Sequence, residues 1–168
     1  MRWTTSCGER TPPPASSEAL APPAPNVEAV PGYTLSDDKT AMDLDAVHAY
    51  LTASYWAHGR SRDVVERSID ASAVCIGAFD SNGNQVGFCR AISDQATFAY
   101  IADLFVLEGH RGKGIARWMV ATLIAHPRLQ ELRRVLLATR DAHALYASVG
   151  FVPVLHPERW MELPNGTL

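Results

Sequence analysis

A glycine-rich turn, His110-Arg111-Gly112-Lys113-Gly114-Ile115-Ala116, separates two apolar segments that repeat with different periods. Residues 97–107, before the turn, have the composition of a strand, and after it apolar residues recur every three to four positions, as in a helix. The first N–H groups of a helix have no partner inside it, and the helix dipole adds positive charge there. Gly112 and Gly114 carry no Cβ, and Arg111 and Lys113 add charge at the same end. The turn therefore predicts a pyrophosphate site.

Two common phosphate-binding motifs do not fit this turn. The Walker motif needs four residues between its glycines and then Lys-Ser or Lys-Thr, and the dinucleotide motif needs a third glycine where Arg117 stands. The pattern that does fit is Arg-x-x-Gly-x-Ala, formed by Arg111, Gly114 and Ala116. So short a pattern is also compatible with a turn that merely begins a surface helix.

A second motif lies about 35 residues further along the chain. Residues 134–139 read as a short strand, and Ala142-x-x-x-Tyr146-x-x-x-Gly150-Phe151 follows it. Asp141 is expected to cap a short helix over residues 142–149, which Gly150 would end.

Together the two motifs resemble those of the GNAT superfamily of N-acetyltransferases, over residues 32–163. The resemblance implies an α/β fold with a central mixed β-sheet flanked by helices, in the order β-α-α-β-β-β-α-β-α-β-β. Ala116 replaces the glycine of many members, which is an accepted variant. Thr139 replaces an asparagine that contacts the cofactor in many members.

The hydrophobic pattern agrees with this order. Helices are expected from apolar residues at helical spacing, and strands from short apolar runs, two of them joined by an Asn-Gly hairpin signal. The expected helices cover residues 43–55, 62–71 and 142–149, and a further helix begins at the glycine-rich turn, with Ile115, Met119 and Leu123 on one stripe. The expected strands cover residues 32–36, 73–79, 85–92, 97–107 and 134–139, with two more near Phe151 and Trp160.

Length and composition indicate one domain, residues 32–168, behind a tail of residues 1–31. The tail holds most of the prolines and has no apolar run of the signal-peptide type, so we expect it to be disordered.

The net charge of -3 argues against nucleic-acid binding, and no apolar run is long enough for a membrane span. The odd number of cysteines, Cys7, Cys75 and Cys89, suggests reduced thiols in a cytoplasmic protein, with the last two buried. We expect no metal, and a monomer or homodimer.

The resemblance implies acetyl transfer from acetyl-CoA to a primary amine of a small molecule or peptide, by direct attack in a ternary complex. A catalytically silent coenzyme A-binding sensor is the alternative, although a sensor would need the loop and not Tyr146. The implied cofactor-binding residues come from the end of the long strand, the glycine-rich turn and the second motif. They are Leu104, Phe105, Val106, Arg111, Gly112, Lys113, Gly114, Ile115, Ala116, Thr139, Ala142 and Tyr146.

Two residues are candidates for the catalytic chemistry. Tyr146 matches the family tyrosine that lies beside the coenzyme A sulfur and acts as general acid, although it could also pack its helix onto the sheet. Asp103 lies in an apolar strand, where a carboxylate is expected to be paired or used. It could bind or deprotonate the amine, or hold a neighbouring arginine. An alkyl ammonium is only ~0.1% free base at neutral pH, so a base or a proton-relaying water is required.

The acceptor amine is expected to bind among aromatic residues. Tyr55 and Trp56 lie between the first two helices, and Tyr100 lies three residues before Asp103. Simple alternation would place Tyr100 and Asp103 on opposite faces of the strand unless a bulge intervenes. Tyrosine is a poor base, so a water relay is favoured over a direct strong base. These aromatic residues, and Trp160 near the C-terminus, could equally belong to the core.

Overall fold

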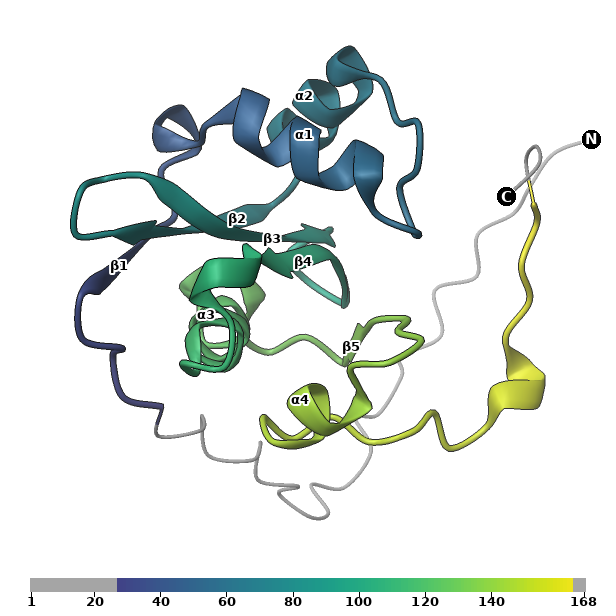
Figure 1. Ribbon diagram of the computed structural model, residues 1–168. Coiled ribbons are helices and arrows are strands. Elements are labelled where there is room, and N and C mark those ends of the chain that lie inside the picture. The colour runs from purple at the N-terminus through teal and green to yellow at the C-terminus, as the bar shows by residue number, and fades with distance from the viewer. Residues whose placement is uncertain (1–26, 165–168) are drawn as a thin grey trace, which may run out of the picture.

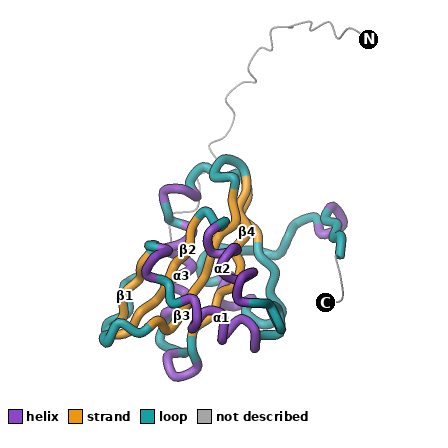
Figure 2. The backbone as a smooth tube through the Cα atoms, turned by 90° about the horizontal axis from the view of Figure 1, so that it is seen from above, coloured by secondary structure: helices purple, strands orange, loops and turns teal. Residues whose placement is uncertain are grey.

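A five-stranded mixed sheet forms the centre of the molecule in the computed structural model, which describes residues 27–164 (Figures 1 and 2). The strands lie in the order β1-β2-β3-β4-β5; all neighbours are antiparallel except β4 and β5, which are parallel. The strands are β1 (Tyr33–Ser36), β2 (Val74–Asp80), β3 (Gln85–Ser93), β4 (Phe98–Val106) and β5 (Arg134–Leu136). The helices are α1 (Leu44–Ala53), α2 (Arg62–Asp70), α3 (Ile115–Ile124) and α4 (His143–Ala147). The expected α/β fold class is confirmed.

Helices cover both faces of the sheet and create two apolar clusters. Helices α1 and α2 lie on one face and α3 on the other, as Figure 1 shows. The α1 side is packed around Leu51, Val65 and Phe88, and the α3 side around Ile76 and Met119, all nearly inaccessible to solvent. Burial of such apolar side chains is the main favourable contribution to folding, so these two layers fix the positions of the loops between them.

The two strands expected near Phe151 and Trp160 are not formed in the described part of the chain. After α4 the chain runs away from the sheet to residue 164, with only a short 3-10 helix, Pro157–Arg159 (Figure 1). Prolines stand at positions 153, 157 and 164, and each removes a backbone donor that a strand would need. The apolar pattern predicted strands because it did not weigh those missing donors.

A bulge in β4 sets the orientation of the residues that matter most. Phe88 pairs with Phe105 and Arg90 with Ala102, so one residue of β3 faces two of β4. Asp103, one of these two, has a left-handed φ of 56°. Before the bulge Ile101 packs on the α3 side, whereas two residues after Asp103 the side chain of Phe105 packs on the α1 side. The change of phase places Tyr100 and Asp103 on the same face, as the sequence allowed if a bulge intervened.

Two residues at the end of the expected tail contact the domain. Residues 1–26 of the expected tail lie outside the described residues, but Val27 and Val30 pack against the cluster on the α3 side. Val30 also accepts a hydrogen bond from the Tyr33 N–H at 3.2 Å. The ordered domain therefore includes residues that composition assigned to the tail.

Two truncations test this boundary. A chain that starts at residue 27 should have the melting temperature of the full-length protein. The melting temperature of a chain that starts at residue 31 should be several degrees lower. The second loses two partly buried valines, worth ~1–3 kcal/mol together, or roughly 4–12 °C in a domain of this size. Differential scanning calorimetry distinguishes the two chains, and equal melting temperatures would show that these valines contribute nothing.

Cys75 and Cys89 are both free and buried, as expected, and burial raises the pKa of Cys75 to about 11. Cys7 lies outside the described residues. Within residues 27–164, no helix is long and apolar enough to cross a membrane. The same residues contain no cluster of three or more side chains suited to a metal ion.

Candidate active site

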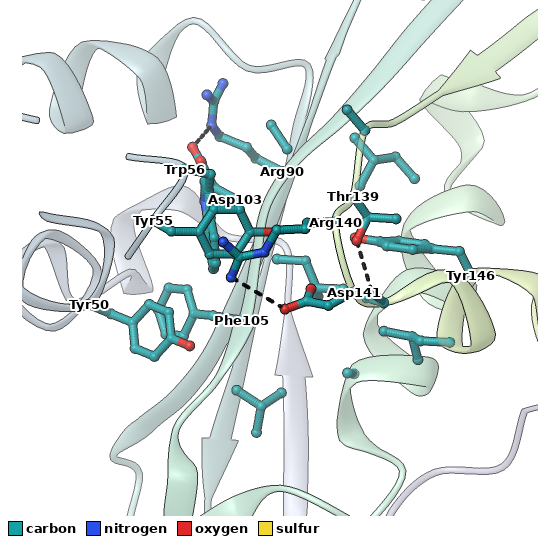
Figure 3. Close-up of a pocket in the computed structure, with 18 of the residues that line it drawn as sticks. Tyr50, Tyr55, Trp56, Arg90, Asp103, Phe105, Thr139, Arg140, Asp141 and Tyr146 are labelled. Atoms are coloured by element: carbon teal, nitrogen blue, oxygen red, sulfur yellow. Dashed lines mark hydrogen bonds and ion pairs between the residues drawn. The ribbon is translucent and has the colours of Figure 1, made fainter. Parts of the chain in front are cut away.

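A cavity of about 800 Å³ lies between β4, the α1–α2 connection and the segment from β5 to α4 (Figure 3). Its size falls in the range of small-molecule sites. The cavity begins at Arg111 and Ala116, beside the glycine-rich turn, and follows β4 back to Tyr100. At ~3.3 Å per strand residue, the six-residue step from Val106 to Tyr100 spans roughly 20 Å.

The cavity exists because β4 and β5 separate. Strand β5 pairs with β4 only at Phe98, Ala99 and Tyr100. Beyond Tyr100 one wall of the cavity is β4, including Leu104, Phe105 and Val106, and the opposite wall is formed by residues 138–142, Leu145 and Tyr146. Among the described residues the β4 main chain has no strand partner on this side. The Val106 carbonyl accepts from Arg111 Nε, and other main-chain polar groups of this wall are available to an extended ligand.

The glycine-rich turn has the conformation of an anion site. Gly112 and Gly114 have left-handed φ values of 75° and 88°, which glycine adopts without strain. Gly114 is the N-cap residue of α3, and no side chain within residues 27–164 caps the first N–H groups of this helix. A Cβ at Gly112 would meet nothing within 4 Å, and one at Gly114 would meet only Val30, at 3.9 Å. An anion can therefore reach these N–H groups closely.

The charged residues of the turn are held in different directions. Arg111 donates from Nε to the Val106 carbonyl at 2.9 Å and from Nη2 to the Tyr50 hydroxyl at 2.9 Å, at the end of the cavity. Lys113 instead donates to the Tyr33 hydroxyl at 2.9 Å, away from the cavity lining. Ile115 is buried in the core. Of the predicted turn residues, Arg111 and Ala116 line the cavity directly.

Tyr146 is brought to the cavity by α4. The expected cap, Asp141, is not the one observed: Thr139 Oγ1 accepts from the Ala142 N–H at 3.0 Å, and Ala142 is the N-cap residue. Tyr146 is only 8% exposed, and its ring contacts Phe151 edge-on at 5.8 Å between centroids. Burial is the main reason that its pKa is raised above that of an ordinary phenol. Figure 3 shows its ring pointing from α4 toward β4.

Asp103 is paired with two arginines. Its Oδ2 accepts from Arg90 Nε at 2.7 Å and from Arg60 Nη1 at 2.9 Å, and the carboxylate side chain is 2% exposed. The alternative in which this carboxylate holds a neighbouring arginine is thus realised. Asp103 and Tyr100 both line the cavity, so the predicted acceptor residues of β4 are brought together.

Aromatic residues form the wall on the α1 side. Tyr50 stacks on Phe105 with centroids 3.9 Å apart, and Trp56 contacts both Tyr50 and Tyr55. The predicted residues Tyr55 and Trp56 line the cavity and remain 49% and 38% exposed. Trp160 is not part of the lining and lies over Arg134 instead.

Sequence reasoning missed ten residues of the lining. Five of them are polar or charged, namely Tyr50, Arg60, Arg90, Arg140 and Asp141. Arg90 carried a usable signal, since a charged residue in the apolar run of residues 85–92 needs a partner, as Asp103 does. Arg60 and Arg140 lie in connections, where a charge predicts nothing about location.

Comparison with known proteins identifies the family to which this chain belongs. The model of the acetyltransferase (GNAT) family matches residues 43–151, from the cap of α1 to the end of the second motif. This chain belongs to the GNAT acetyltransferase family.

Relatives of this GNAT protein support the same assignment. A Gibberella zeae protein assigned as an acetyltransferase is 32% identical over 136 residues, which cover 68% of this chain and 75% of that protein. A crystal structure from Xanthomonas campestris pv. campestris, assigned to the GNAT family, is 44% identical with a TM-score of 0.77, covering 82% of this chain and 96% of that one. A Deinococcus radiodurans structure shares the fold at 21% identity, with a TM-score of 0.63 and coverage of 82% and 92%. Acetyl transfer in general is therefore supported.

Proposed function

We propose that this GNAT protein transfers an acetyl group from acetyl-CoA to a primary amine of a small molecule or peptide, by direct attack in a ternary complex. The observation that carries the proposal is a single cavity that joins the glycine-rich turn, Tyr146 and the buried charges at Asp103. Such a cavity has room for a donor and an acceptor at the same time, as direct transfer requires.

The residues of the cavity fit acetyl-CoA. The uncapped start of α3 and the open space beside Gly112 and Gly114 suit its pyrophosphate. The unpaired edge of β4 at Leu104, Phe105 and Val106 suits its amide-bearing arm. Across the cavity Thr139, Ala142 and Tyr146 would contact the same arm. Lys113 would have to leave Tyr33 to reach a phosphate, and Ile115 would contribute through its backbone.

Acetyl-CoA supplies a thioester whose sulfur leaves as a thiolate, and we assign the proton for that sulfur to the Tyr146 hydroxyl. Asp103 is proposed to act on the acceptor through the arginines it holds, since its Oδ2 is already engaged twice. The amine proton then passes to water beside Tyr100 and Asp103, in line with the expected relay. Tyr55 and Trp56 bound the acceptor from the opposite wall.

The experiment that tests this function measures thiol release from acetyl-CoA with a panel of amines: amino acids, polyamines, aminoglycosides and N-terminal peptides. Amine-dependent release supports the enzyme. Calorimetric binding of acetyl-CoA without release by any amine would indicate the coenzyme A-binding sensor instead. A cytoplasmic location and a monomeric or homodimeric state stay predictions.

Replacing Gly114 by aspartate should weaken acetyl-CoA binding by ten-fold or more, or ~1.4 kcal/mol and upward. The carboxylate would face the pyrophosphate, and the left-handed φ of 88° adds strain. Gly114→Asn carries the same bulk and strain without the charge, so titration calorimetry of the pair isolates the electrostatic part.

Gly83→Asp provides the matched control for this prediction. Gly83 has a left-handed φ of 81° in the β2–β3 turn and does not line the cavity. This variant should bind acetyl-CoA as the parent does. Unchanged affinity in a folded Gly114→Asp protein would refute the pyrophosphate assignment.

A further inference from the structure

The acceptor end of the cavity carries more positive than negative side chains. Arg60, Arg90 and Arg140 line it together with Asp103 and Asp141. The glycine-rich turn contributes only Arg111 and Ala116 to the lining, and these five residues belong to other segments. The excess of one positive charge is a property of the acceptor region itself.

Two of these guanidinium groups share one carboxylate oxygen. Arg60 and Arg90 both donate to Asp103 Oδ2, and the other hydrogen bond of the Arg90 side chain, from Nη1, goes to the neutral Ser72 hydroxyl at 3.2 Å. Among the described residues neither guanidinium has another ion-pair partner. The Arg90 side chain is only 10% exposed, whereas that of Arg60 is 24% exposed and lines the cavity. One cation of this cluster is therefore left without a counter-charge beside the acceptor space.

A third guanidinium lies at the edge of the cavity. Arg140 lies over the Tyr55 ring, 3.7 Å from its centroid, and its closest approach to Asp141 is 3.9 Å (Figure 3). Its side chain is 66% exposed, so it can reorient toward a ligand. The contact with Tyr55 spans from the α4 side of the cavity to the α1 side.

These charges select the chemistry of the acceptor. An ammonium group alone would be repelled by the unmatched guanidinium, and a partly buried charge without a partner is costly. An acceptor that brings its own anion removes both penalties, and guanidinium groups bind carboxylate and phosphate in a planar, bidentate manner. We infer that the acceptor is an amine that also carries an anionic group, a carboxylate or a phosphate, which Arg60 binds with support from Arg140. The inference rests on the proposed function.

Bisubstrate conjugates test the inference without requiring turnover. Coenzyme A is joined through S–CH₂–CO to the amine of glycine, 3-aminopropanoate or 2-aminoethyl phosphate, and the neutral controls use glycinamide and 3-aminopropanamide. Titration calorimetry should show at least one anionic conjugate binding about ten-fold more tightly than the neutral ones, as a charge-assisted hydrogen bond provides. The better of the two anion types then distinguishes a carboxylate from a phosphate acceptor.

Variants of single arginines test which side chain causes the preference for anionic conjugates. Arg60→Gln should reduce the anionic-to-neutral affinity ratio to below about three-fold, and Arg140→Gln, at an exposed side chain, should reduce it less. Arg62→Gln is the control, because Arg62 pairs with Asp45 outside the cavity and should leave the ratio unaltered.

The outcomes separate this inference from the proposed function. Equal affinity of anionic and neutral conjugates would overturn the anionic acceptor and leave acetyl transfer intact, and so would a preference that Arg60→Gln does not change. Failure of coenzyme A and of every conjugate to bind would overturn the proposed function, and this inference with it.

Discussion

Asp103→Asn is expected to lower the free energy of unfolding by about 3–5 kcal/mol, because it leaves a buried guanidinium without its counter-charge. Arg90 is the residue that loses its counter-charge, since its side chain is 10% exposed and its ion pair is with Asp103. Asparagine is the suitable replacement because it has the same shape and, like aspartate, tolerates the left-handed φ of 56° found here. Urea denaturation measures the loss.

Two further variants make this result specific. Asp63→Asn removes an exposed carboxylate 3.5 Å from Arg67, and exposed pairs contribute only ~0–1 kcal/mol, so its stability should hardly change. Adding Arg90→Met to Asp103→Asn should recover part of the loss, because the uncompensated charge is gone. A loss below about 1 kcal/mol in Asp103→Asn would show that Arg90 is adequately solvated without its partner.

The same variant reports on the acceptor. If Asp103 orders Arg60 and Arg90 at the acceptor end, Asp103→Asn should impair kcat or the KM of the amine, with acetyl-CoA affinity kept within about two-fold. Weakened acetyl-CoA binding with unaltered amine kinetics would assign Asp103 to the donor instead. Measurements at a temperature well below the lowered melting point separate these kinetics from unfolding.

The fold was predictable where local signals agree with one another. The strand, the glycine-rich turn and helix α3 follow directly from the spacing of apolar residues and from the glycines of the turn. Strand β4 lies within one residue of the expected bounds at each end, and α3 begins at the turn as expected. The segment after Phe151 was mispredicted because apolar residues there alternate as in a strand while prolines remove the donors. Val27 and Val30 were assigned to the tail because two valines among prolines give no periodic signal.

The candidate site was less predictable, for a reason rooted in geometry. The bulge in β4 contains no glycine that would indicate it in the sequence, yet it places Tyr100 and Asp103 on one face. Pairing across the fold is also invisible in one sequence: Arg60 is 43 residues from Asp103, and Arg111 is 61 residues from Tyr50. The sequence therefore indicated which residue types carry chemistry, while the charge balance of the acceptor end emerged only from their contacts.

Tyr146→Phe is expected to lower kcat at least ten-fold while acetyl-CoA affinity and melting temperature are preserved. Loss of a positioned acid typically costs ~10²–10⁴-fold, and water can replace part of the function. Burial raises the pKa of Tyr146, which weakens it as an acid toward a thiolate whose conjugate thiol has a pKa near ~8.5. The effect should therefore fall toward the lower end of that range.

The pH dependence gives the second part of this test. A raised pKa keeps the Tyr146 phenol protonated at and below its ordinary pKa of ~10, and the acid is lost only when the pH rises through the higher value. The ratio of parent to Tyr146→Phe kcat should thus be constant from pH 6 to 9. Tyr33→Phe is the control, since the Tyr33 hydroxyl binds His110 and Lys113 outside the cavity lining, and its kcat should match the parent's. A Tyr146→Phe enzyme with parental kcat over this range, and with parental single-turnover rates, would reduce Tyr146 to a packing residue.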